Sequence, residues 1–465
     1  MEAFSNYHPY CKINILERQT PGYSPPDAGV WNKIMGRCEF DMDTLKLPGL
    51  HTLVISLPQY SNRSRGYQRL DDVFPFLFTG PGLKHLCFDP NNSADADSFE
   101  TLRAILQSLL DINDTKPISQ LESLTVTSNG KQGGFLSELA AVGNLSQLRT
   151  LDIGCIMNPA SLSNTAGLFP HLERLFIDLV RRNSPIVTKT DEEESIAGIM
   201  AFCPLKYLYI KGLRSAESLD RIIQHHGPSL KGLALVPFGG KRHGYPRLGP
   251  SELHEMAIRC PNLEELRLPV ARSGGNQAEC EMYKALGSFR NLQTIFLDLD
   301  FDARPKAPAL GEHVTEDLDV LQKTFINAAM DENLALQIWS MIKGKRSCLK
   351  DLRLLPTGNQ CFAPDERYLL FCLARSYLLT HYNLENPGSP VIEQIGKTAW
   401  EVKRAVGQTI VPDVIRDGEL LLSDGVVSVL HSIWPQVHKQ SDWWSSWTSL
   451  PLQPDNCLPS SCSKA

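Results

Sequence analysis

Ten short segments of the chain repeat one pattern of spaced aliphatic residues, L-x-x-L-x-L or a close variant. They are LHTLVI (50–55), LKHLCF (83–88), LESLTV (121–126), LRTLDI (148–153), LERLFI (172–177), LKYLYI (205–210), LKGLAL (230–235), LEELRL (263–268), LQTIFL (292–297) and LKDLRL (349–354). The last two aliphatic positions are two residues apart, so in an extended strand both side chains point to the same face. The pattern therefore predicts ten short strands, each with one buried face.

The spacing of these segments indicates a solenoid. Successive segments begin 24 to 38 residues apart, with one longer interval of 57 residues before the last. These intervals match a leucine-rich repeat of roughly 20–29 residues or exceed it by an insertion. Helical periodicity appears between several segments, at 98–112, 192–202, 215–227, 249–260 and 278–289. The expected fold is an α/β leucine-rich-repeat solenoid, a horseshoe with parallel strands on the concave face and helices outside.

The repeat does not extend over the whole chain. Residues 1–45 are expected to form a partly irregular N-terminal segment and partial cap with a short helix at 27–38, and residues 46–355 the solenoid. An insertion or degenerate repeat is expected at about 300–348, with a helix from Thr315 to Lys343 that breaks near Asp331. Residues 356–455 are expected to form a helical C-terminal cap, with helices at 365–384, 389–406 and 425–434, before a flexible tail at 456–465.

Composition limits the function classes. The formal charge of −6 over 465 residues argues against a nucleic-acid or anionic-membrane partner, and no apolar run is long enough to span a bilayer. The twelve cysteines form no C-x-x-C pair, and no secretory signal is recognisable, so we expect an intracellular protein, cytoplasmic or nuclear, without a metal site. No catalytic or cofactor motif is present, so we expect no enzyme and no cofactor. An alternative is a hydrolase or transferase in 356–465 that uses His431 and His438.

Residues that flank the buried leucines are the candidate partner-binding residues, because they face the concave surface. We expect the contacts to come from Arg174, Phe176, Tyr207, Tyr209, Lys211, Glu265, Arg267 and Phe296. Thr294, Asp298, Asp351 and Arg353 are expected to face solvent on the same surface. Aromatic and arginine side chains are typical of interaction hot spots. The alternative is that the aromatic residues only pair across neighbouring strands.

Three further features have a structural interpretation that we favour. Cys260 and Cys203 are expected to pack in the core as small apolar residues. Trp434, Trp443, Trp444 and Trp447 are expected to close the core of the C-terminal cap, with an external peptide as the alternative ligand. The basic loop 239–249 is expected to be an insertion, with binding of a phosphate or acidic partner as the alternative.

Several motifs also resemble a known family. They are CPLKYLYI (203–210), CPNLEELRLPV (260–270), YKALGSFRNLQTIFLDLD (283–300), FINAAMDENLALQIWSMI (325–342), LARSYLL (373–379), VVSVLHSIWP (426–435) and SDWWSSWTSLPL (441–452). With these motifs, residues 45–455 resemble the fungal F-box and leucine-rich-repeat-like proteins. The resemblance implies recognition of a protein partner without catalysis, by analogy with the substrate receptors of ubiquitin ligases.

The resemblance does not extend to the F-box itself. Residues 1–45 lack the Leu-Pro start and the alternating Leu/Ile pattern of that module. The expected function is therefore a non-enzymatic scaffold that binds an unknown protein partner on the concave face. The alternative is a substrate-recognition subunit of a cullin-type ubiquitin ligase that binds a Skp-type adaptor, with its F-box lost or missing from the gene model.

Overall fold

The computed structural model describes residues 52–56, 84–89, 121–126, 145–155, 159–179, 189–237, 244–304, 317–344, 348–358, 362, 364–381, 389–397, 415–416, 419–420, 422–435 and 447–454. The expected N-terminal segment 1–45, its helix at 27–38, the helix at 98–112 and the tail at 456–465 lie outside these residues. The chain divides into two compact units, Met1–Leu208 and Tyr209–Ala465. The boundary falls within strand β6 (Tyr207–Lys211).

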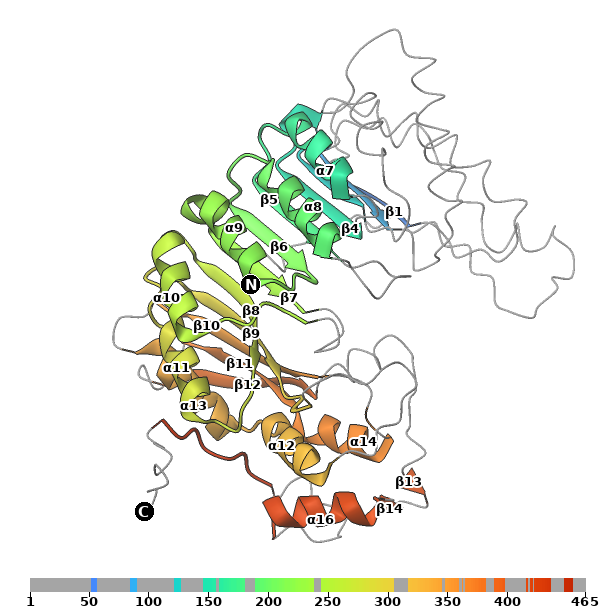
Figure 1. Cartoon of the computed structure of the whole chain (residues 1–465), viewed down its shortest axis with the longest axis vertical. Helices are drawn as coiled ribbons and strands as arrows, with labels where there is room; N and C mark the ends of the chain where they lie inside the picture. The colour runs from blue at the N-terminus through green and yellow to red at the C-terminus, as the bar shows by residue number, and fades with distance from the viewer. Residues whose placement is uncertain are drawn as a thin grey trace, which may run out of the picture. The chain divides into compact units, whose positions relative to one another are not determined.

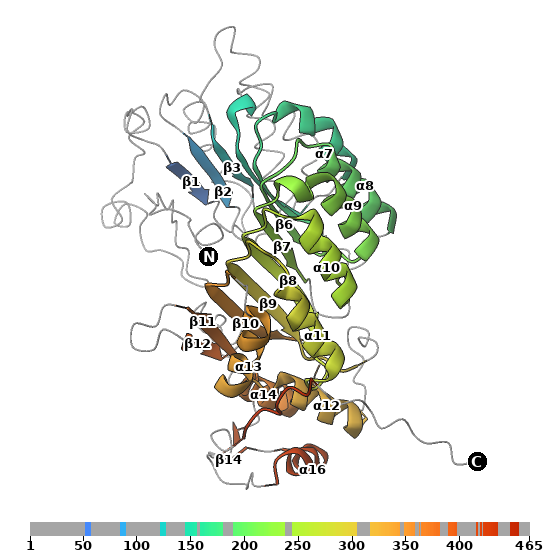
Figure 2. The same cartoon turned by 90° about the vertical axis from the view of Figure 1, so that its left-hand side faces the viewer.

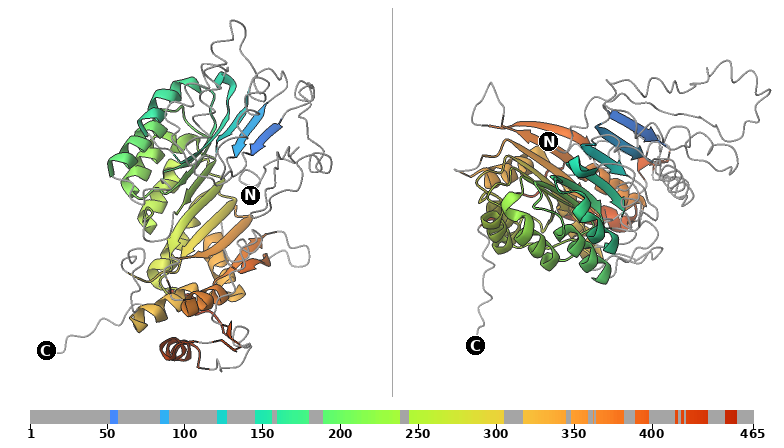
Figure 3. Two further views of the ribbon diagram at one scale, coloured as in Figure 1. Left: turned by 90° about the vertical axis from the view of Figure 1, so that its right-hand side faces the viewer. Right: turned by 90° about the horizontal axis from the view of Figure 1, so that it is seen from above.

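All ten repeat segments form strands, and each strand begins two residues after the first leucine of its segment. In the first unit, β1 (Thr52–Ser56), β2 (His85–Asp89), β3 (Ser123–Val126), β4 (Thr150–Cys155) and β5 (Arg174–Asp178) pair in chain order, all parallel. Helices α7 (Pro159–Thr165) and α8 (Lys189–Met200) lie on one face of β4 and β5 (Figure 3). A Cβ at Gly198 would lie 2.9 Å from that of Leu162, so this glycine allows the two helices to pack closely.

The second unit continues the same arrangement. Strands β7 (Gly232–Val236), β8 (Glu265–Ala271), β9 (Thr294–Asp300) and β10 (Asp351–Thr357) are consecutive and parallel. Helices α9 (Ala216–His226), α10 (Pro250–Arg259), α11 (Gln277–Leu286) and α13 (Glu332–Lys343) alternate with them in the chain. Figures 1 and 2 show α10 and α11 along one face of β8 and β9. The described part is thus a mixed α/β protein with open, mostly parallel sheet, compatible with an α/β solenoid.

Burial alternates along the strands as the repeat pattern predicts. In β9, Ile295 and Leu297 are buried, whereas Thr294 and Phe296 are partly exposed. β5 and β10 show the same alternation. The buried leucines face the helices, so the strand residues between them lie on the opposite face.

Charged side chains at the second position of the repeat segments form ion pairs between neighbouring strands. The pairs are Lys84–Glu122 at 2.6 Å, Arg149–Glu173 at 3.4 Å and Lys206–Glu173 at 3.0 Å in the first unit, and Lys231–Glu264 at 3.0 Å in the second. Such exposed pairs contribute at most about 1 kcal/mol each. Opposite charges at equivalent positions nevertheless favour the observed strand register over a shifted one.

The interval before the last repeat contains two helices and a break at the predicted residue. α12 (Leu318–Ala328) and α13 are separated at Asp331, whose carboxylate caps α13 by accepting a hydrogen bond from the Leu334 backbone N–H at 2.9 Å. A carboxylate at this position satisfies a free N–H group and also complements the helix dipole. The break therefore has a local cause.

The expected all-helical C-terminal cap is wrong in part. α14 (Pro364–Leu373) and α16 (Asp424–Ile433) are helices, but β11 (Arg375–Thr380) and β12 (Val391–Lys397) extend the sheet as antiparallel strands. A short hairpin, β13 (Ile415–Arg416) and β14 (Glu419–Leu420), follows. α14 packs on α12 and shares a buried cluster with α12 and α16. After α14, the chain therefore returns to the sheet at the C-terminal end of β10. The next strand therefore runs in the opposite direction.

Candidate functional site

The open face of β8, β9 and β10 carries two rows of partly exposed side chains. Strand register aligns Arg267 with Phe296 and Phe296 with Arg353. The row two residues earlier consists of Glu265, Thr294 and Asp351, also in register. The row between them, Leu266, Ile295 and Leu352, is buried on the helix side. Three strands thus place one aromatic ring between two arginines on the face that the helices do not cover in the described part.

Phe296 interacts with both arginines. The guanidinium carbon of Arg267 lies 3.9 Å from the centre of the Phe296 ring, and that of Arg353 lies 4.7 Å from it. Stacking of a guanidinium on an aromatic ring is favourable by about 0.5–1 kcal/mol at exposed sites and by more where water is excluded. The ring therefore holds two like charges, one on each of the strands β8 and β10 that flank β9.

Only one of the two arginines has a carboxylate partner within this cluster. Arg267 donates two hydrogen bonds to Asp298, from Nε at 2.8 Å and from Nη2 at 2.9 Å. Asp298 was expected to face solvent, but its side chain is 1% exposed. Burial raises the pKa of Asp298, and the hydrogen bonds from Arg267 oppose that rise. The two hydrogen bonds from Arg267 favour the charged form of the Asp298 carboxyl group.

Arg353 has a different environment. Its Nε is buried and makes no hydrogen bond with any part of the chain that the structure describes. Burial lowers the pKa of Arg353, the neighbouring Arg267 lowers it further, and Asp298 raises it. Since a guanidinium stays protonated in proteins, this direction means that its positive charge is poorly compensated.

The eight predicted contact residues are distributed over both units. In the first unit, the guanidinium of Arg174 stacks 4.6 Å from the centre of the Tyr207 ring, and Phe176 is partly exposed on the same strand as Arg174. Tyr209 and Lys211 are partly exposed in the β6 segment of the second unit. Glu265, Arg267 and Phe296 belong to the open face described above. Their role in binding a partner stays a prediction.

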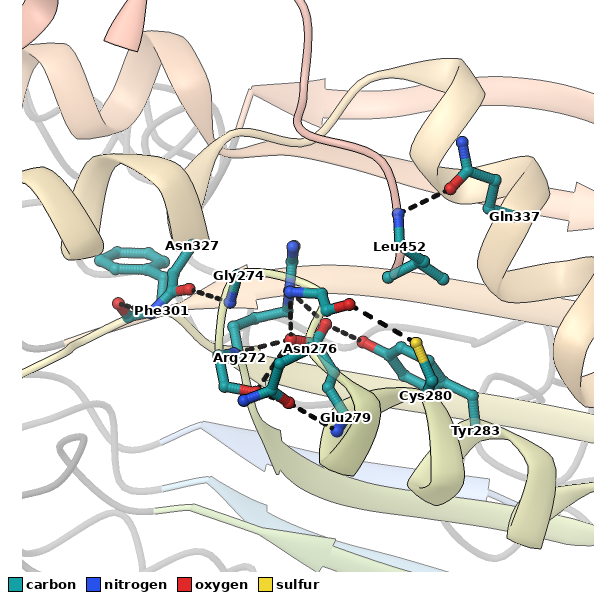
Figure 4. Close-up of polar contacts among 12 residues, drawn as sticks. Arg272, Gly274, Asn276, Glu279, Cys280, Tyr283, Phe301, Asn327, Gln337 and Leu452 are labelled. Atoms are coloured by element: carbon teal, nitrogen blue, oxygen red, sulfur yellow. Dashed lines mark hydrogen bonds and ion pairs between the residues drawn. The ribbon is translucent and has the colours of Figure 1, made fainter. Parts of the chain in front are cut away.

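A buried ionic network between β8 and α11 was not anticipated from the sequence (Figure 4). Arg272 Nε lies 2.7 Å from Glu279 Oε1, and the two side chains are 2% and 0% exposed. Glu279 also accepts hydrogen bonds from the Tyr283 hydroxyl at 2.8 Å and from the backbone N–H groups of Ser273 and Gly275 at 2.7 and 2.9 Å. Burial, followed by the charge of Glu279, raises the pKa of Tyr283 well above its ordinary value.

The loop between β8 and α11 also contacts residues near the end of the chain. The backbone N–H of Gln453 donates to the Gly275 carbonyl at 2.7 Å. The backbone N–H of Leu452 donates to Gln337 Oε1 at 2.8 Å (Figure 4). Gly275 has φ +72°, and a Cβ there would lie 3.1 Å from the Leu452 Cα. Residues 447–454, which we call the C-terminal segment, thus pack against the β8–α11 loop and α13.

Two further aspartates of β9 and its extension have their own partners. Tyr245 donates a hydrogen bond to Asp300 at 2.9 Å, and Arg304 donates to both carboxylate oxygens of Asp302 at 2.9 Å. Burial and the charge of Asp300 raise the pKa of Tyr245 above its ordinary value. In the described ranges no group of three or more His, Cys, Asp or Glu side chains is arranged to hold a metal ion.

The remaining predicted features divide into confirmed and corrected ones. Cys260 is buried as expected, but Cys203 is exposed, because the preceding Phe202 occupies the equivalent core position. Trp434 and Trp447 are buried with their rings 6.0 Å apart, as the cap interpretation predicts. Trp443, Trp444 and residues 239–243 of the basic loop lie outside the described residues.

No protein-family model matches the chain, and no curated protein matches its sequence. Within the described residues, none of the helices combines the length and apolar character needed to cross a membrane.

Proposed function

We propose that this chain is a leucine-rich-repeat protein that binds a protein partner on the open face of its strands, without catalysing a reaction. The repeat spacing and the parallel strands in chain order support the repeat class. In such solenoids the strand face is the usual extended binding surface.

The observation that carries the proposal is the stacked row Arg267–Phe296–Arg353. An aromatic ring fixed between two arginines is a preorganised, partly exposed group of the residue types that dominate interface energies. Ordinary cross-strand packing accounts for one such contact, but two like charges on one ring disfavour each other. A partner that places a negative charge over this row would offset that repulsion.

Affinity capture with the full chain as bait tests the proposal. The Phe296→Ala variant is expected to lose one or more proteins that the native chain captures. Ile258→Ala is the matched control, because Ile258 is 79% exposed on α10, away from the strand face. Identical captured sets for all three baits, with folding verified by circular dichroism, would exclude this face as the binding surface.

The ubiquitin-ligase alternative differs in one additional partner. It uses the same strand face for its substrate and requires a second surface for a Skp-type adaptor. That surface would lie outside the open face of β8–β10, so Phe296→Ala would leave adaptor binding unchanged.

A further inference from the structure

Within the row of Arg267, Phe296 and Arg353, only one of the two guanidinium groups is paired with a carboxylate, while Glu265 and Asp351 occupy the neighbouring row. Arg267, Arg353 and Asp298 contribute two positive charges and one negative charge. Both oxygens of Asp298 are engaged by Arg267. Arg353 therefore retains a positive charge, and its buried Nε has no acceptor among the described residues.

The position of Arg353 makes this charge available to a ligand. Its side chain is partly exposed and lies on the strand face, stacked on Phe296 at 4.7 Å. The stacking fixes the plane of the guanidinium, so little side-chain entropy is lost when an acceptor binds. Fixed guanidinium groups bind carboxylates through paired hydrogen bonds.

We propose that Arg353, held by Phe296 and assisted by Arg267, receives an aspartate or glutamate side chain of the protein partner. This inference depends on the proposed binding function of the same face and specifies the chemistry of its partner. A single carboxylate matches the one guanidinium of this row that has no ion-pair partner among the described residues.

The surrounding acidic residues favour a carboxylate over a phosphate group. Glu265 and Asp351 occupy the neighbouring row, two residues before the arginines on the same face, and Asp298 accepts hydrogen bonds from Arg267. A phosphate group carries a charge of roughly −1.5 to −2, so these carboxylates would repel it more strongly than a monoanion. The site therefore selects a single negative charge.

A peptide-display selection against the full chain tests both the binding function of this face and the inference that its ligand is a carboxylate. The native protein is expected to enrich peptides that share one Asp or Glu and that lose binding to the Phe296→Ala variant. Enrichment of Phe296-dependent peptides without a shared acidic residue would overturn the carboxylate inference but not the binding function. Failure to enrich any Phe296-dependent peptide would count against both.

A double-mutant cycle on one selected peptide then identifies the arginine. Changing the acidic residue to its amide is expected to weaken binding to the native chain about ten- to hundredfold. The same change should have little effect on the Arg353→Met variant, and its full effect on Arg290→Met, an exposed arginine in the turn before β9. Equal losses in the native chain and Arg353→Met would overturn the assignment, as would tighter binding of a phosphoserine peptide. An unchanged thermal unfolding curve shows that Arg353→Met is folded.

Discussion

The Glu279→Gln substitution tests whether the buried network of Figure 4 holds the β8–α11 loop. The change keeps the size of the side chain but removes its charge. The carboxylate of Glu279 is the only ion-pair partner of Arg272 within the described residues, and Nε and Nη1 of Arg272 make no hydrogen bond there. The substitution therefore leaves a buried guanidinium without a counter-charge.

The expected loss of stability is large. Removal of one partner of a buried ion pair costs about 3–5 kcal/mol, since the remaining charge stays desolvated. For a unit of this size, each kcal/mol lowers the melting temperature by about 2–4 °C, so the expected decrease is about 6–20 °C. Glu281→Gln on the same helix is the matched control, because Glu281 pairs with Lys284 at the surface. That change is expected to alter the free energy of unfolding by at most about 0.5 kcal/mol.

Urea unfolding followed by tryptophan fluorescence measures this difference. Six of the seven tryptophans lie after residue 208, so the signal reports mainly on the second unit. The double variant Arg272→Met, Glu279→Gln should recover part of the stability, because it removes the uncompensated charge as well. If Glu279→Gln and Glu281→Gln unfold at the same urea concentration, the buried network does not stabilise the loop.

Three other predictions address separate features. In urea unfolding, Gly275→Ala should destabilise the chain more than Gly244→Ala. Both glycines have positive φ, which costs alanine about 1–2 kcal/mol, but only Gly275 also contacts Leu452. Equal losses of stability would contradict a role for the contact with Leu452. Burial raises the pKa of Cys260 to about 12, so its thiol stays protonated at pH 8. Iodoacetamide should therefore label the exposed Cys203 but not Cys260 in the folded chain, which mass spectrometry measures. Co-purification of a Skp-type adaptor is expected only under the ubiquitin-ligase alternative, and its absence from a quantitative capture would remove that alternative.

The sequence predicted the strands well, because each repeat segment contains its own signal. Two aliphatic residues at alternate positions decide which face of a strand is buried, and no distant residue changes that outcome. The ion pairs between Lys84 and Glu122 and between Lys231 and Glu264 were not predicted, although opposite charges recur at one position of successive segments.

Features that depend on distant residues could not be predicted in the same way. RSYLLT (375–380) follows a helix directly and fits either a helical or an alternating pattern, so its strand conformation depends on the neighbouring β10. Glu279, the ionic partner of Arg272, lies in α11, and the loop that leads to this helix turns at Gly274 and Gly275, which have positive φ. For Arg353, the sequence places Arg267 and Asp298 on the same face but does not decide which of the two arginines pairs with the Asp298 carboxylate.

The C-terminal segment has a consequence for biosynthesis. Gln453 and Leu452 supply backbone hydrogen bonds to Gly275 and Gln337, residues that leave the ribosome much earlier. During translation, the contacts of the β8–α11 loop and α13 with the C-terminal segment therefore form only after residues 452 and 453 have been synthesised. Nascent chains stalled before residue 447 should accordingly be more sensitive to protease at this loop than chains stalled well beyond residue 454.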